Sequence, residues 1–372
     1  MRTTGTSSVL IAVLLGLCGC GSSLLRPSEV PVDPDRVRAR IATLLPGTLA
    51  NRGDWAADLF AALEALGVEA SDRNVCAVLA VTEQESGYQV NPAVPNLPAI
   101  ARREIDAKAA ALKIPRFAVG AALEIRSPDG RSYRERIEAA RTEKALNDIF
   151  EDFLDQVPLG RRLFAGYNPV RTAGPMQVSI AYAEEHARRR RYPFPMQGSL
   201  RDELFTRRGG LYFGAAHLLD YPADYEDMLH RFADFNAGHW ASRNAAFQNA
   251  LAMAAGRKVA MDGDLLIRGD GADRPSQTEL AARSLAGQLG LSEREIRRDL
   301  ERGTHDDFAR TRLYRGVFEI ATRRRGRSPP AAVMPRIRLQ SPKITRNLTT
   351  EWFAQRVDGR YQRCLARAAP VT

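Results

Sequence analysis

The segment RNVCAVLAVTEQES, residues 73–86, decides the fold class of this chain. Its apolar and small side chains recur at steps of three and four residues, at Val75, Val78, Leu79 and Thr82. This spacing is typical of one face of an α-helix. Glu85 continues the series, so we expect its carboxyl group to point to the buried side of the helix. Gly87 follows as the expected C-terminal cap. The segment predicts a buried helix that ends at a carboxyl group.

The same helical spacing extends over most of the chain. It predicts helices over residues 55–66, 73–86, 102–113, 133–157, 200–219, 225–235, 241–255, 277–289, 293–302, 306–322 and 350–366. Ser276 with Glu279, and Ser292 with Glu295, have the spacing of capping boxes, which supports two of the starts. Strand signals are few, the best being a short one at 265–267, and the prolines between 91 and 98 predict a loop. We therefore expect an all-α fold.

The N-terminal region is typical of an exported protein. The apolar run at 9–17 is too short to span a bilayer but has the length of a secretory signal. It ends in LCGC, residues 17–20, which resembles a bacterial lipobox with Cys20 as the lipid-bearing residue; an ordinary cleaved signal is the alternative. We expect a signal peptide over 1–19 and a tether over 20–34. Gly21 replaces the aspartate typical of inner-membrane lipoproteins, so we expect a lipid anchor in the outer membrane, facing the periplasm.

The mature part of the chain keeps two of the four cysteines, Cys76 and Cys364. In an oxidising compartment they either pair as a disulfide or remain two buried thiols, and the sequence leaves both open. The five histidines are scattered, and no cysteine or histidine cluster has zinc spacing, so we expect no metal and no cofactor. The formal net charge of +10 favours a polyanionic partner, and export argues against nucleic acid.

Burial of Glu85 has a chemical consequence. Without an adjacent cation, desolvation disfavours a carboxylate, so we expect the pKa of Glu85 to rise above its ordinary ~4.3 toward ~6. A carboxylic acid with that pKa can protonate a glycosidic oxygen at neutral pH. Glu83 is expected to project elsewhere into solvent. Asp234 is a reserve candidate, expected mainly as a solvated charge at a helix end.

Three segments resemble motifs of the soluble lytic transglycosylases and goose-type lysozymes, in the same order along the chain. Glu85-Ser86 resembles the first motif, AGPMQVS at 173–179 the Gly-Leu-Met-Gln motif, and DFNAG at 234–238 the Tyr-Asn-Ala-Gly motif. The resemblance implies a lysozyme-like helical domain in which Glu85 is the single catalytic acid and base. It also implies that contacts to the glycan come from Ser86, Gly174, Met176, Gln177, Phe235 and Asn236.

Two positions depart from the family pattern. Pro175 stands in place of leucine, and Phe235 stands in place of tyrosine, which removes a hydroxyl group expected near Glu85. Tyr182 or Tyr212 is a candidate to supply that group. The resemblance covers about residues 55–255. The whole chain also looks like an uncharacterised family of proteobacterial lipoproteins of this size.

The long separation of Glu85 from Gly174 implies an insertion. We expect a lysozyme-like catalytic domain over 35–98 and 170–260, an inserted helical subdomain over 99–169, and a C-terminal helical region over 261–372. The insertion or the C-terminal region is the expected surface for an envelope protein partner. The arginine run at 188–191 is expected either to line the substrate groove or to lie on a solvated face.

These expectations combine into one reaction. The resemblance implies that Glu85 protonates the oxygen of the MurNAc-GlcNAc β-1,4 bond in peptidoglycan, then takes the proton of the C6 hydroxyl, which closes a 1,6-anhydro ring. No second carboxylate has a comparable buried-face pattern, which favours transglycosylation over hydrolysis. A hydrolytic muramidase, and a catalytically degenerate peptidoglycan-binding or scaffold lipoprotein, are the alternatives.

Overall fold

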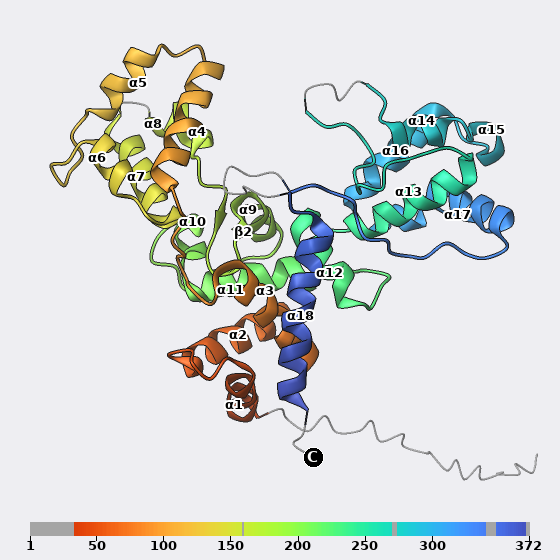
Figure 1. The fold of residues 1–372 in the computed structure, drawn as a ribbon, viewed down its shortest axis with the longest axis horizontal. Coiled ribbons are helices and arrows are strands. Elements are labelled where there is room, and N and C mark those ends of the chain that lie inside the picture. Colours follow the sequence, from red (N-terminus) through yellow and green to blue (C-terminus); the bar gives the residue numbers. More distant parts are fainter. Residues whose placement is uncertain (1–32, 158–159, 270–273, 340–346, 370–372) are drawn as a thin grey trace, which may run out of the picture.

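The computed structural model describes residues 33–157, 160–269, 274–339 and 347–369. Over these residues it is built of helices and a single two-stranded hairpin, which confirms the predicted all-α class (Figure 1). The expected signal peptide, Cys20 and nearly all of the expected tether lie outside the described residues. None of the helices that the structure describes combines the length and apolar character needed to cross a bilayer.

The helices form a central body with two lobes (Figure 1). The body begins with α1 (Pro34–Leu44), α2 (Arg52–Leu66) and α3 (Asp72–Ser86). It continues with the hairpin β1 (Thr172–Ala173) and β2 (Val178–Ser179), then α9 (Ile180–Arg189), α10 (Leu200–Leu204), α11 (Arg207–Leu219) and α12 (Met228–Ala237). The first lobe comprises α4 (Leu97–Ala111), α5 (Arg116–Leu123), α6 (Tyr133–Ala139), α7 (Glu143–Gln156) and α8 (Gly160–Phe164). The second comprises α13 (Ala241–Ala255), α14 (Gln277–Arg283), α15 (Ala286–Leu289), α16 (Glu293–Glu301) and α17 (Arg312–Arg325). The last helix, α18 (Thr350–Ala368), returns to the body.

Helix α3 is the buried centre of the body. Every side chain from Val75 to Thr82 is at most 2% exposed. The helix packs against α18 on one side and contacts α11, and α18 also packs against α12. Ser71 caps its start by accepting a hydrogen bond from the backbone N–H of Asn74. The helix predicted from 73–86 is therefore confirmed, but its middle is enclosed on all sides rather than on one face.

A second hydrophobic core lies within the lobe of α13 to α17. Its fully buried side chains include Phe247, Leu251, Leu300, Phe308 and Val317. The two cores divide the chain differently from the boundary expected at residue 261, because α13 contributes to the second core whereas α18 belongs to the first. The expected C-terminal region is thus a helical lobe followed by a helix that completes the central body.

Four stretches that were predicted as single helices are each interrupted in the structure. The stretches 133–157, 200–219, 277–289 and 306–322 each divide into two shorter helical segments. Thr142, Thr206 and Thr311 stand at three of the breaks, where each side chain accepts a hydrogen bond from the next helix. A threonine that caps a new helix competes with continuation of the preceding one. Helical periodicity persists across such a break, so the pattern alone does not reveal it.

Other boundaries also differ from prediction. Helices α1, α5, α8 and α9 were not expected, and residues 265–267 are irregular rather than a strand. The predicted loop at 91–98 runs into α4, which begins at Leu97. Pro98 lies in the first turn of α4, where a missing backbone N–H costs nothing because that group has no partner within the helix.

Candidate functional site

Glu85 lies in the last turn of α3, where the fully buried helix meets the surface. Its side chain is half-buried. Gly87 ends the helix in the left-handed conformation (φ 58°), and its N–H donates to the carbonyl of Glu83. Ser86 is buried, and its hydroxyl donates to the carbonyl of Thr82 at 3.1 Å. The carboxyl group of Glu85 therefore stands on a rigid support, while its raised pKa stays a prediction.

Glu83 is paired rather than solvated, which corrects the sequence expectation. Its Oε1 lies 3.4 Å from Nε of Arg360 and 3.4 Å from Nη2 of Arg363. Both arginines belong to α18, so they neutralise the Glu83 carboxylate and join the last turns of α3 to the middle of α18. Because Glu83 already has two cationic partners, it is a poor candidate for a proton donor.

Helix α18 brings the ends of α3 and α12 to the same region. A disulfide joins Cys76, early in α3, to Cys364, late in α18, and Glu83, later in α3, pairs with Arg360, earlier in α18, so the two helices run antiparallel. At the start of α18 the hydroxyl of Thr350 donates to Oδ1 of Asn236, at 3.1 Å. In the register set by the Cys76–Cys364 bond, Glu85 is level with about residue 355 of α18, roughly 8 Å along the helix from Thr350 at 1.5 Å per residue. The first and third motifs therefore lie near the same half of one helix.

The second motif forms the turn of the β1–β2 hairpin. Gly174 has φ +74°, and a Cβ at this position would lie 2.2 Å from the carbonyl oxygen of Leu204. Only glycine fits this close approach. Gln177 also has positive φ (49°), and its side chain is held by Gly174 and Thr172: Nε2 donates to the carbonyl of Gly174, and Oε1 accepts from the hydroxyl of Thr172, each at 3.1 Å. The Gln177 amide is thus fixed in a half-buried position.

The hairpin packs against glycines of α11. A Cβ on Gly210 would lie 2.4 Å from Cδ of Pro175, and a Cβ on Gly214 would lie 2.2 Å from Sδ of Met176. Met176 has no exposed surface. It therefore packs beneath the hairpin and has no exposed surface for the glycan contact that the resemblance implies. The ring of Pro175 fits against a helix that lacks a side chain at the point of contact.

In the third motif, Asn236 and Phe235 have different environments. Asn236 is exposed apart from its bond to Thr350, whereas Phe235 is only 8% exposed. Gly238 ends α12 with φ 105°, and its N–H donates to the carbonyl of Asp234 at 2.8 Å. The segment is therefore a helix C-cap, and Asn236 is its member with surface free for a ligand to approach.

Asp234 is fully buried, so its interpretation as a solvated helix-end charge is wrong. One carboxylate oxygen accepts from the N–H of Ser242 at 2.7 Å, and the other accepts from the hydroxyls of Tyr221 (3.0 Å) and Tyr225. Burial raises the pKa of Asp234, while the bonds from Tyr225, Ser242 and Tyr221 oppose that rise. Asp234 thereby ties the end of α12 to the start of α13, and its role is structural.

Histidines that are scattered in the sequence gather beside the third motif. The ring of His217 stacks on that of His239 (4.5 Å between centroids) and lies 5.0 Å from Phe235 and 4.4 Å from Tyr182. Nε2 of His217 donates to the carbonyl of Phe235 at 3.1 Å, and Nε2 of His239 donates to the carbonyl of His217 at 2.7 Å. Burial lowers the pKa of His217 to about 3, with His239 as a further cause, and burial lowers the pKa of His239 to about 4.

This ring cluster joins the second and third motifs through α11. Tyr182 lies in the first turn of α9, the helix that follows the hairpin, and His217 lies one turn beyond Gly214, which the hairpin contacts. Tyr182 is half-buried and close to the His217 ring, whereas Tyr212 is completely buried. Tyr182 is therefore the one of the two with exposed surface, and its role as the replacement for the missing hydroxyl stays a prediction. The cluster leaves no mark in the sequence, because its members share neither a spacing nor a helix face.

The four arginines at 188–191 have different environments. Arg188 and Arg189 are largely exposed and pair with Glu185, one turn earlier. Arg190 instead donates to the carbonyls of Ala65 and Leu66 and pairs with Asp220. Arg191 is exposed as well, so three of the four side chains lie at the surface, and Arg190 joins α9 to α2. Among the residues that the structure describes, no group of histidine, cysteine and acidic side chains could hold a metal ion.

The comparisons with known proteins identify the family. The family model DUF1615, described as a protein of unknown function, matches residues 48–367, so the chain belongs to this family. The chain is also 50% identical, over 364 residues, to an uncharacterised protein of Escherichia coli K12 named YaiW; the match covers 98% of this chain and 99% of that protein. No solved structure matches. The predicted membership of an uncharacterised family is confirmed.

Proposed function

We propose that this protein is a peptidoglycan lytic transglycosylase in which Glu85 is the single acid and base. The observation that carries the proposal is the placement of the three motif segments. The second and third motifs both contact α11, through Met176 and Phe235 respectively. The first motif ends beside the half of α18 that contacts Asn236. The helices that carry these segments contact one another although about 150 positions separate Glu85 from Asn236, and this arrangement supports the proposal.

In this proposal Glu85 acts twice. As an acid it gives its proton to the oxygen that leaves when the MurNAc-GlcNAc bond breaks. As a carboxylate it then takes the proton of the C6 hydroxyl of the MurNAc residue. The C6 oxygen attacks the anomeric carbon of that residue and closes the 1,6-anhydro ring. The proton lost in the first step is regained in the second, and intramolecular attack gains from proximity. Gln177 and Asn236 offer amides for the sugar hydroxyl and N-acetyl groups.

The test compares two glutamates of one helix. The chain from Gly21 to Thr372 is incubated with peptidoglycan sacculi, and soluble muropeptides are measured. Glu85→Gln should lower their release at least ~100-fold, the lower end of the effect of an acid–base group. Glu83→Gln is the matched control, with the same chemical change two residues away, and should retain activity. Equal activity of Glu85→Gln and the unaltered chain would contradict the proposal.

A second candidate is a peptidoglycan-binding protein without activity. Phe235 favours it, because this side chain removes the hydroxyl expected near the catalytic carboxyl group. A chain that pellets with sacculi but releases no muropeptide supports the binder. A chain that releases muropeptides with hydrated reducing ends supports a muramidase. Replacement of Tyr182 by Phe decides whether its hydroxyl compensates, since a compensating group should be needed for turnover but not for pelleting.

The proposed place of action is the periplasmic face of the outer membrane. It is supported by the signal-like run at 9–17 and by Gly19-Cys20-Gly21. Cys20 would carry the lipid, and two or more acyl chains are needed for stable anchoring. Labelled palmitate should enter the unaltered chain and not Cys20→Ser, and the latter should leave the membrane fraction. Palmitate incorporation that persists in Cys20→Ser would contradict this assignment.

A further inference from the structure

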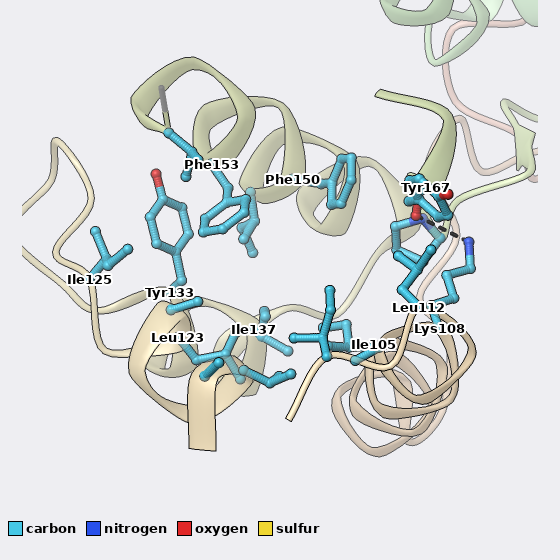
Figure 2. Close-up of a pocket in the computed structure, with 18 of the residues that line it drawn as sticks. Ile105, Lys108, Leu112, Leu123, Ile125, Tyr133, Ile137, Phe150, Phe153 and Tyr167 are labelled. Carbon is cyan, nitrogen blue, oxygen red and sulfur yellow. Dashed lines mark hydrogen bonds between the residues drawn. The ribbon is translucent and has the colours of Figure 1, made fainter. Parts of the chain in front are cut away.

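The lobe of α4 to α8 contains an apolar pocket of about 380 Å³. Figure 2 shows its walls, in which side chains from α4, α5, α6 and α7 surround an open interior. The principal ones are Ile105, Leu123, Ile137, Ile149, Phe150 and Phe153. Carbon atoms make up nearly all of the lining. The pocket lies within the inserted lobe and is distinct from the motif segments described above.

The pocket is open to solvent, and its almost entirely carbon lining distinguishes it from the other hollows of the described surface. An apolar cavity of ~150 Å³ already binds benzene, and ligand pockets begin at ~300 Å³. The volume of this pocket, about 380 Å³, lies in the ligand range. Helices that could have packed together are instead held apart around a space that only an apolar occupant would fill favourably.

One end of the pocket carries positive charge. Nζ of Lys108 donates to the carbonyl of Tyr167 at 3.1 Å, and both residues line the pocket (Figure 2). Burial lowers the pKa of Lys108, and the positive charge of nearby Arg171 lowers it further, while Glu104 opposes both. One cationic group, Lys108, therefore stands at the rim of a carbon-lined space, with Arg171 and Glu104 near enough to act on its charge. This arrangement matches a ligand with a long apolar part and a negative end.

Large apolar side chains at the pocket edge are exposed to solvent. Leu112 is 41% exposed, Ile125 is 42% exposed and Tyr167 is 38% exposed, and all three line the pocket. Phe117, on the same lobe, is 79% exposed. Exposed apolar groups gathered at one place mark a binding surface more often than isolated ones do. They provide an apolar path between the pocket and the outside.

We propose that this lobe binds a single acyl chain that ends in an anionic group, as in a fatty acid or a lysophospholipid. The chain would lie among the isoleucines and phenylalanines, with its acidic end toward Lys108. This site uses none of the motif residues, so failure of the proposed function would not affect this proposal.

The binding test uses the chain from Gly21 to Thr372 and fatty acids from octanoate to palmitate, followed by displacement of a fluorescent fatty acid. Each added methylene should tighten binding about three- to fourfold until the pocket is full, because a buried methylene is worth ~0.8 kcal/mol and ~1.4 kcal/mol is tenfold. Lysophospholipids of the same chain lengths identify which head group is preferred. An affinity that does not change with chain length would overturn the proposal.

Two variants on α5 provide the matched comparison. Ala122 lines the pocket, whereas its neighbour Ala121 is exposed and outside it. Ala122→Trp should fill the space and weaken binding at least tenfold, while Ala121→Trp should bind as the unaltered chain does. Equal weakening by both, or by neither, contradicts the proposed location. The chain-length series needs no variant, so the proposal remains testable if Ala122→Trp fails to fold.

The negative end is tested through Lys108. Lys108→Gln should weaken binding of a fatty acid severalfold and leave binding of the alcohol of equal length unchanged. Loss of both ligands would indicate damage to the pocket, and loss of neither would exclude the proposed role of the charge. An amphipathic peptide that displaces the probe more tightly than any fatty acid would show a protein partner instead of a lipid.

Discussion

Cys76 and Cys364 are joined by a disulfide across a sequence separation of 288 residues. The bond connects the buried centre of the body to the last helix of the chain, and it lies on the same two helices that hold Glu85 and contact Asn236. The returning helix is therefore part of the candidate site rather than an appendage to it.

Reduction of this disulfide should lower the free energy of unfolding by about 2–5 kcal/mol, because a bond that closes a long loop restricts the unfolded chain. Denaturant unfolding with and without reductant measures the difference. A chain with both cysteines replaced by alanine should be insensitive to reductant. Unfolding curves of the unaltered chain that coincide in both conditions would contradict the stabilising role.

Gly214→Ala should destabilise the chain by about 1–3 kcal/mol, because the new Cβ would lie 2.2 Å from Sδ of Met176 and force the hairpin away from α11. Gly120→Ala is the control, since a Cβ there has nothing within 4 Å and alanine favours a helix by ~0.5–1 kcal/mol. Urea unfolding compares the two. A stabilised Gly214→Ala chain would show that the hairpin is free to move.

Asp234→Ala should cost roughly 3 kcal/mol or more, because it leaves two tyrosine hydroxyls and a backbone N–H buried without their acceptor. Asp234→Asn should cost less, since its amide oxygen still accepts one of these bonds. Asp224 is exposed in the same connection, and Asp224→Ala should change the stability by no more than about 0.5 kcal/mol. Thermal or urea unfolding of the three chains should give this order; equal costs for Asp234→Ala and Asp224→Ala would refute it.

Stability should fall as the pH is lowered from 6.5 to 5. The pKa values of His217 and His239 in the folded chain, about 3 and about 4, lie below the ~6.5 of an unfolded histidine. Between pH 6.5 and 5 these two residues therefore take up protons only in the unfolded chain. Each histidine contributes a slope of up to ~1.4 kcal/mol per pH unit. His239→Gln should flatten the dependence, whereas replacement of the exposed His305 should not. Parallel curves for these two variants would contradict the account.

The sequence predicts well what depends on local pattern. The buried helix at 73–86 and its cap at Gly87 follow from periodicity and from the conformational freedom of glycine. Burial of Val75 and its neighbours was predicted for one face, but the structure encloses the whole middle of the helix. The second face is buried by α18, which lies almost 300 positions away in sequence and leaves no local trace.

The candidate site was predictable only in part. The motif order indicates Glu85, Gln177 and Asn236, but not that Met176 would be fully buried or that Glu83 would pair with two arginines of α18. The stacking of His217 on His239 and the burial of Asp234 are tertiary effects, because they depend on which helices meet. The pocket in the first lobe is of the same kind, since an empty space between helices has no sequence pattern.

The most direct measurement of the central claim is mass spectrometry of muropeptides released from sacculi in water labelled with heavy oxygen. If Glu85 transfers the C6 hydroxyl proton and closes the sugar on itself, the products should be one water lighter than hydrolytic muropeptides, carry no label, and disappear with Glu85→Gln. Labelled products with ordinary reducing ends, or anhydro products that persist in Glu85→Gln, would contradict the account.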